Sequence, residues 1–237
     1  MSTYRLDKLF NPGSIALVGG SPRENSLGGI VLRNLKAAEF AGELHVVNPR
    51  YSEIAGMRTV PSLDRLTQTP DVAVVTAPAG AVPGIISECG TLGIAAAVVI
   101  SAGLGHGSGS LAEDAALAAR RHGVRIVGPN GLGVIVPRAK MNASFAARMP
   151  RPGDLALISQ SGAVAAALGE WSSRRSVGFS AVVSIGDALD VDFGDLLVFS
   201  RSTARHARSC STSSRSPIRA NSCLRHARRH APNPSWW

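Results

Sequence analysis

Glycines and small polar residues follow the first apolar run of the chain, and their spacing suits phosphate binding. The run Ser14–Val18 leads into two glycines, and an amphipathic stretch, Ile30–Phe40, begins soon afterwards. Glycines let a backbone approach a phosphate closely, and the start of a helix offers free N–H groups at the positive end of its dipole. Arg23 either adds positive charge or faces water. The segment expected to bind the phosphates of a nucleotide is Gly19-Gly20-Ser21-Pro22-Arg23.

The end of the second apolar run, Leu44–Asn48, helps to distinguish between nucleotides. A fold that binds NAD has an Asp or Glu at this point, which holds the ribose 2′-hydroxyl. This chain has Asn48, Pro49 and Arg50 instead. An arginine attracts a phosphate that a carboxylate would repel. The residues therefore favour a nucleotide whose ribose has an extra phosphate over NAD. The alternative is that Arg50 is a turn residue facing water.

Apolar runs alternate with helix-like stretches along most of the chain. Further strands are expected at Val72–Thr76, Ala96–Ser101 and Arg125–Val127, and helices at Ser62–Leu66, Val82–Leu92 and Leu111–His122. Continuous apolar strands separated by helices predict an α/β fold with a Rossmann-like parallel sheet covered on both faces. Ligands of such sheets bind beyond the carboxyl ends of the strands. The loops after the strands are therefore expected to form one crevice; they begin at Asn48-Pro49, Ala77-Pro78, Ala102-Gly103 and Gly128-Pro129.

The pattern restarts after a connecting stretch, Pro137–Pro152. A strand is expected over Asp154–Ile158, a helix from Ala163 to about Ser173, another strand over Phe179–Ser184 and a further helix over Asp192–Phe199. This is the beginning of a second α/β domain with room for about two strands. The residues that start its first helix are Ser159-Gln160-Ser161-Gly162, and serines in this position are good N-caps whatever the function.

The composition of the chain changes at Ser200. The formal net charge of +9 comes from this segment, because residues 1–199 have 17 Lys and Arg against 16 Asp and Glu, whereas residues 200–237 have eight arginines and no acid. One interpretation is a disordered basic tail that binds nucleic acid or an acidic surface. The other, which we favour, is that the tail has left the ancestral reading frame, because the change falls within a helix pattern. Nucleic acid is therefore not the partner we expect.

Composition also indicates the compartment. No apolar run approaches the length that spans a bilayer, and Met1–Phe10 has no secretory signal. Of three cysteines only Cys89 lies in the patterned part of the chain. We therefore expect neither a disulfide framework nor a membrane partner, and a cytoplasmic location is the default. No metal site is expected.

Five segments in order give the chain a more specific resemblance. They are Leu9–Ala16, Val47–Tyr51, Gly128–Gly133, Met141–Phe145 and Leu157–Ala163. Together they resemble the NDP-forming acyl-CoA synthetases, relatives of the succinyl-CoA synthetase α subunit, over about residues 6–199. Gly186–Asp192 is similar to the bacterial branch in which such a module is fused to a GNAT protein acetyltransferase.

The resemblance implies a CoA-binding Rossmann-like domain over residues 6–140, an incomplete flavodoxin-like second domain over 150–199, and a tail over 200–237. It implies that CoA or acyl-CoA is the ligand. The residues that would line the adenine and pantetheine path are Thr76-Ala77-Pro78 and Ser101-Ala102-Gly103, and those that would lie near the reactive end of CoA are Pro129-Asn130-Gly131. Ordinary tight turns are the alternative for the first two groups. In the family, a helix start that resembles Ser159–Gly162 receives the phosphate of a phosphohistidine.

Departures from the family pattern limit the expected activity. Many members have Cys or Ser where Gly131 stands, so we expect CoA binding to survive and efficient chemistry to suffer. The phosphohistidine motif, its assisting glutamate and the ATP-grasp domain have no counterpart here, so ATP or ADP would act only through absent domains or a separate ATP-grasp subunit. We expect the CoA-binding portion of an acyl-CoA synthetase or acetyltransferase fusion, truncated and inactive alone. The alternatives are a regulatory CoA- or dinucleotide-binding module with a separate partner, and a nucleic-acid binder that uses the basic tail.

Overall fold

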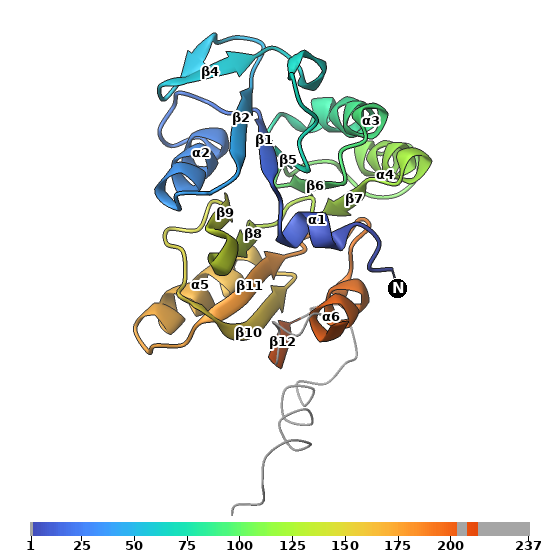
Figure 1. The fold of residues 1–237 in the computed structure, drawn as a ribbon. Helices are drawn as coiled ribbons and strands as arrows, with labels where there is room; N and C mark the ends of the chain where they lie inside the picture. The colour runs from blue at the N-terminus through green and yellow to red at the C-terminus, as the bar shows by residue number, and fades with distance from the viewer. Residues whose placement is uncertain (1, 203–207, 213–237) are drawn as a thin grey trace, which may run out of the picture.

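The computed structural model describes residues 2–202 and 208–212, which form two packed sheets with helices (Figure 1). The first sheet has seven strands in the order β3-β4-β2-β1-β5-β6-β7. Neighbouring strands are parallel except for β3 and β4, which pair antiparallel. Its strands are β1 (Ser14–Val18), β2 (Glu43–Val47), β3 (Glu53–Ile54), β4 (Met57–Val60), β5 (Val72–Val75), β6 (Ala96–Val99) and β7 (Arg125–Val127).

Helices cover both faces of this sheet, as the sequence pattern predicted. They are α1 (Leu6–Phe10), α2 (Leu27–Ala37), α3 (Val82–Leu92) and α4 (Leu111–His122), with short 3₁₀ turns at Leu63–Arg65 and Ala79–Ala81. Ile86 of α3 and Ala115 of α4 are buried in one cluster, and Leu9 of α1 and Leu35 of α2 in another. Figure 1 shows α2 on one side of β1 and α3 and α4 on the other. The prediction of a doubly covered parallel sheet is therefore confirmed.

The second sheet contains five strands in the order β12-β10-β11-β8-β9. They are β8 (Gly133–Val136), β9 (Met141–Ser144), β10 (Pro152–Ser159), β11 (Phe179–Ser184) and β12 (Arg208–Thr212). Strands β10, β11 and β12 are parallel, whereas β8 runs antiparallel to β11 and to β9. Two helices accompany this sheet, α5 (Gly162–Ser173) and α6 (Phe193–Ser202), and a 3₁₀ turn, Pro137–Ala139, lies between β8 and β9.

This second sheet is larger than the sequence pattern indicated. The segment of residues 133–144, expected to end the first domain and begin a connection, forms a hairpin that adds two strands. Its apolar run is short and stops at Pro137, so the pattern of residues does not predict strand pairing there. The basic segment showed no strand pattern, yet its residues 208–212 pair with β10. Helix α6 also extends to Ser202. The rest of the tail, with both interpretations made for it, lies outside the described residues.

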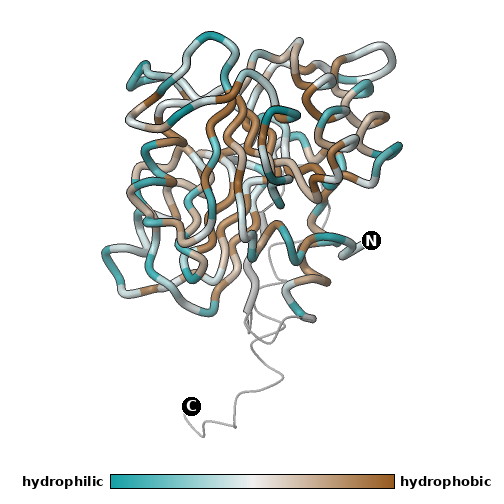
Figure 2. Tube along the Cα trace, turned by 45° about the horizontal axis from the view of Figure 1, so that its top comes forward, coloured by the Kyte–Doolittle hydropathy of each residue, from teal (hydrophilic) through white to brown (hydrophobic). Residues whose placement is uncertain are grey.

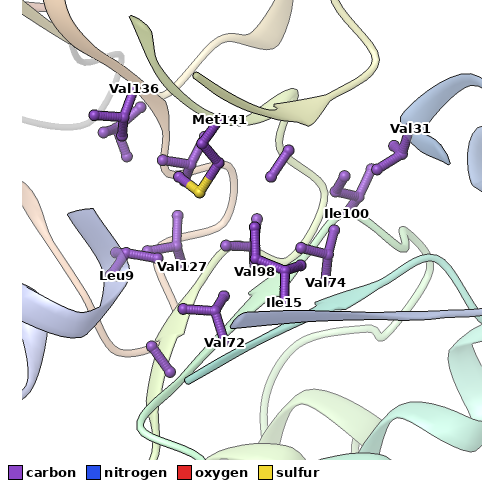
Figure 3. Close-up of a cluster of buried hydrophobic side chains, with 14 of the residues drawn as sticks. Leu9, Ile15, Val31, Val72, Val74, Val98, Ile100, Val127, Val136 and Met141 are labelled. Carbon is purple, nitrogen blue, oxygen red and sulfur yellow. The ribbon is translucent and has the colours of Figure 1, made fainter. Parts of the chain in front are cut away.

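One of the buried hydrophobic clusters contains residues of both sheets. Figure 3 shows Val74 and Val98 of the first sheet near Met141 of the β8–β9 hairpin, and all three belong to one buried cluster. Phe10 of α1 and Phe199 of α6 stack with ring centroids 4.8 Å apart. Figure 2 shows hydrophobic residues concentrated along the central strands and hydrophilic residues in outer turns. The shared core holds the ends of both sheets in fixed relation.

A buried arginine strengthens the same junction. The Arg125 guanidinium, on a side chain 8% exposed, donates to Asp190 at 2.8 Å and to Asp195 at 2.7 Å. It also donates to the backbone carbonyl of Ser2 at 2.7 Å. Burial alone would lower the pKa of Arg125, but its hydrogen bonds and charge interactions with the two aspartates raise the pKa above its usual value. The network therefore ties β7, α6 and the start of the chain together.

Candidate functional site

The glycine loop after β1 is fixed by the ends of its neighbours. Asn48, just beyond β2, donates its side-chain N–H to the carbonyl oxygen of Gly20 at 2.7 Å. A Cβ on Gly28 would lie 2.1 Å from the carbonyl oxygen of Gly19, so α2 begins directly against the loop. Ser26 caps α2 by accepting the N–H of Gly29 at 3.1 Å. The sequence therefore places the loop at a helix start, the arrangement that binds phosphates.

The loops that follow β1, β2, β5, β6 and β7 form a row along one edge of the sheet. Hydrogen bonds link the loops after β5, β6 and β7 to the glycine loop and to one another. The Thr76 hydroxyl donates to the carbonyl of Val18, the last residue of β1, at 3.2 Å. The Ser101 hydroxyl donates to the carbonyl of Ala77 at 2.6 Å, and the backbone N–H of Asn130 donates to the carbonyl of Ser101 at 3.0 Å. The structure thus brings the predicted loops together, as expected. Because Ser101 is buried and its hydroxyl is already bonded within the row, it positions the loops and does not face the solvent.

Two predicted cations, Arg23 and Arg50, are exposed near this row. The backbone N–H of Arg50 donates to the Asn48 side-chain oxygen at 2.8 Å, and that of Arg23 donates to the Ser21 hydroxyl at 3.2 Å. These contacts fix the backbones. Neither guanidinium forms an ion pair within the part of the chain that the structure describes. Both guanidinium groups are therefore available to a ligand, and Pro22, Pro49 and Pro78 are exposed as well.

Gly131 connects the row to the second sheet. A Cβ at this position would lie 2.5 Å from the carbonyl oxygen of Ser184, at the end of β11. Asn130 donates its side-chain N–H to Asp187 at 3.4 Å, and the carbonyl of Pro129 accepts the N–H of Asp187 at 2.9 Å. The backbone of β11 therefore approaches the loop more closely than a side chain at position 131 would allow. Ala102 and Gly103 are exposed in the loop after β6.

The start of α5 lies next to the junction between the two sheets, where Gly131 contacts the end of β11. Ser161 accepts the N–H of Val164 at 3.4 Å, and the Ser159 hydroxyl donates to the carbonyl of Ser161 at 2.9 Å. A Cβ on Gly162 would lie 3.3 Å from Leu132, the residue after Gly131. Ser161 is therefore the N-cap of α5, as the alternative interpretation of this segment expected. The cap is compatible with anion binding, because it leaves other N–H groups of the first turn unpaired.

Two positioning residues were not assigned a role from the sequence. Asn34 of α2 donates to the carbonyls of Ser144 and Ala146, both at 2.8 Å, and so ties α2 to the β8–β9 hairpin. Ser184 is the other, and its surroundings are considered below. An amide on the inner side of an amphipathic helix was the only signal for Asn34. Nothing in a strand of small residues distinguished Ser184 from its neighbours.

The remaining reactive side chains lie elsewhere. His45 is on β2, 3.4 Å from the Glu43 carboxylate, His106 is in the exposed loop after β6, and His122 ends α4. Burial raises the pKa of the Cys89 thiol to about 12, so it is not a nucleophile near neutral pH. Among the described residues there is no group of three or more His, Cys, Asp or Glu side chains suited to a metal ion. No helix in the described segments has the length and apolarity to cross a membrane.

Comparison with known proteins agrees with this geometry. A family described as "CoA binding domain" matches residues 13–137, and one described as "Succinyl-CoA ligase like flavodoxin domain" matches residues 152–230. Acetate–CoA ligase [ADP-forming] I of Archaeoglobus fulgidus is 40% identical over 197 residues, covering 82% of this chain and 28% of the relative. The alpha subunit of acetate–CoA ligase [ADP-forming] I of Pyrococcus furiosus is 38% identical over 201 residues, covering 82% of this chain and 44% of the relative.

A solved structure extends the likeness to the fold. The dinucleotide forming acetyl-coenzyme A synthetase 1 of Ca. Korarchaeum cryptofilum, in complex with phosphate and ADP, matches with a TM-score of 0.83 and 34% identity. The match covers 90% of this chain and 47% of that one. This chain therefore spans less than half the length of these relatives.

The strand ends and the two matched domains define a CoA-binding α/β module. The chain belongs to the CoA-binding domain family, in the form joined to a succinyl-CoA ligase-like domain that NDP-forming acyl-CoA synthetases contain. The resemblance inferred from the sequence motifs is confirmed. A fusion to an acetyltransferase stays a prediction.

Proposed function

We propose that this chain binds CoA or acyl-CoA along the strand ends of its first sheet and a phosphate at the start of α5. It would then be the CoA-binding portion of an NDP-forming acyl-CoA synthetase. The observation that carries the proposal is the row of hydrogen bonds from Asn48 through the glycine loop to Ser101 and Asn130. These hydrogen bonds join the loops along one edge of the sheet, where an extended ligand would run from its phosphates to its reactive end.

Charge at the end of β2 supports CoA over NAD. Arg50 is exposed directly after the Asn48 turn, and no carboxylate occupies the Asn48-Pro49-Arg50 segment to hold a ribose 2′-hydroxyl. A guanidinium favours the 3′-phosphate of CoA through charge-assisted hydrogen bonds. In this arrangement the glycine loop holds the pyrophosphate and Arg50 holds the ribose phosphate.

The test compares CoA with 3′-dephospho-CoA by calorimetry on the full chain. The wild-type chain should bind CoA about tenfold more tightly, the effect of one charge-assisted contact at an exposed site. Arg50→Met should remove this preference and leave dephospho-CoA binding unchanged. Arg121→Met, which removes an exposed arginine at the far end of α4, is the matched control. Equal affinities of the wild-type chain for the two ligands would contradict the assignment of Arg50.

We expect no thioester synthesis by the chain alone. The three described histidines lie on β2, after β6 and at the end of α4, none of them on the elements around α5. Since none of these three described histidines is placed to carry it, we propose that a phosphoryl group held at α5 is supplied by another domain or subunit, such as an ATP-grasp partner. Incubation with acetate, CoA and ATP should give no acetyl-CoA, and its formation would refute this part of the proposal.

A further inference from the structure

Ser184 is a buried hydroxyl that lacks a partner. It is the last residue of β11, it is 1% exposed, and its Oγ has no hydrogen-bond partner within the described part of the chain. An unpaired buried hydroxyl is costly, and nearly all such groups in folded proteins are bonded. Ser184 therefore has a free donor at the junction between the two sheets.

The strand register shows which way this hydroxyl faces. Val182 packs in a cluster with Ala165 of α5, whereas Val183 packs in the cluster on the opposite face. Side chains alternate along a strand, so Ser184 lies on the same face as Val182 and α5. Ser184 is also in register with Ser159 at the end of β10. The hydroxyl thus lies beneath the end of α5 where the helix begins.

The contacts of Gly131 and Gly162 complete the site. A Cβ at Gly131 would lie 3.3 Å from the Ser184 Oγ, and a Cβ at Gly162 would lie 3.3 Å from Leu132. Ser184 and the first residue of α5 therefore pack against two consecutive residues of one loop. Ser184 offers a hydroxyl donor on the face of β11 that packs against α5, and the first N–H groups of this twelve-residue helix are donors as well.

We infer that the Ser184 hydroxyl donates a hydrogen bond to a phosphate oxyanion held at the N-terminus of α5. The inference rests on the proposed function and deepens it, since it names the side chain that supplements the helix N–H groups. A tetrahedral phosphate has oxygens for the helix donors and for a hydroxyl on a different element. Ser184 then orients the anion, and glycine at position 131 places no side chain of its own beside this hydroxyl.

The experiment measures binding of inorganic phosphate to the full chain at constant ionic strength, in the presence of saturating CoA. CoA fills the phosphate sites of the first sheet, so the remaining signal reports α5. Ser184→Ala should weaken phosphate binding about tenfold or more. Ser184→Cys keeps the volume of the side chain but is a poor donor, and should weaken binding similarly. Ser180→Ala is the matched control, because Ser180 lies on the same face of β11, is equally buried and also lacks a partner.

The outcomes separate this inference from the proposed function. Weakened phosphate binding in both Ser184 variants, with wild-type affinity in Ser180→Ala, supports the inference. Wild-type affinity in Ser184→Cys, equal weakening in Ser180→Ala, or absence of phosphate binding by the CoA-saturated wild-type chain would overturn it. CoA affinity is measured on the same variants and should not change. If the chain takes up phosphate through Ser184 but ignores CoA, the CoA assignment fails while the role of Ser184 stands.

Discussion

Replacing Gly28 with alanine places a methyl group at the contact between α2 and the glycine loop. The new Cβ would lie 2.1 Å from the Gly19 carbonyl oxygen, 3.0 Å from the Gly19 carbonyl carbon and 3.1 Å from the Thr76 hydroxyl. Ordinary contact begins at 3.4 Å, so the loop and the helix must separate by about 1 Å. The obstructing oxygen belongs to the backbone, which cannot rotate away as a flexible side chain can.

The cost follows from two opposing effects. Overpacking of this kind destabilises a fold by about 1–3 kcal/mol, whereas alanine in a helix gains about 0.5–1 kcal/mol over glycine. Gly84, near the start of α3, provides the matched control because a Cβ there meets nothing within 4 Å. Gly84→Ala should therefore stabilise the chain, and Gly28→Ala should destabilise it. Because the helix gain applies to both variants, they should differ by the cost of overpacking, roughly 1–3 kcal/mol in the free energy of unfolding.

Urea unfolding and CoA calorimetry on both variants give the assay. Gly28→Ala should bind CoA at least about tenfold more weakly. A displacement of about 1 Å moves the loop that would hold the phosphates beyond the range of distances over which a hydrogen bond forms. Gly84→Ala should bind CoA like the wild-type chain. If Gly28→Ala were as stable as Gly84→Ala and kept wild-type CoA affinity, the close approach of α2 to the loop would have no energetic role.

Three further predictions concern the supports of the site. Arg125→Met should lower the free energy of unfolding in urea by about 3–5 kcal/mol because it leaves Asp195 buried without its charge partner. The double variant Arg125→Met with Asp195→Asn should recover part of that loss. No recovery would argue against the charge explanation. Burial favours neutral Asp71, but the Lys8 ammonium at 3.0 Å and the N–H of Gly13 hold its pKa below the usual value. The charged carboxylate therefore stabilises the fold above about pH 4 and this stabilisation is lost as the pH falls through the folded-state pKa, so Lys8→Met should move acid unfolding to higher pH, and an unchanged midpoint would contradict this. Gly131→Cys should lower the melting temperature because its Cβ would lie 2.5 Å from the Ser184 carbonyl oxygen, and a melting temperature at or above the wild-type value would contradict the close packing.

Five strands of the first sheet, β1, β2, β5, β6 and β7, were predictable because each has a strong local signal, whereas the short strands β3 and β4 were not predicted. The apolar runs around β1, β5 and β6 are continuous, and Ser26 and Ser110 cap helices with the side-chain geometry that their sequence favours. The expected helix over Ile30–Phe40 begins three residues earlier, at Leu27, because the Ser26 cap and two glycines form its first turn. Local chemistry determines these elements, so the sequence alone identifies them.

The second sheet was less predictable because its strands depend on distant partners. The hairpin of β8 and β9 forms by pairing with β11 and by burying Met141 against the first sheet, and neither contact has a local sequence pattern. β12 is a strand only through its pairing with β10. The same reasoning applies to the site. Glycine spacing identified the loop, whereas the buried orientation of Ser184 and the Arg125 network required three-dimensional contacts.

Calorimetric titration of the full chain with CoA, alongside NAD⁺, tests the central claim most directly. The row of strand ends and the exposed Arg50 predict saturable, equimolar binding of CoA and no measurable binding of NAD⁺ under the same conditions. Binding of NAD⁺ by a chain that does not bind CoA would contradict the account.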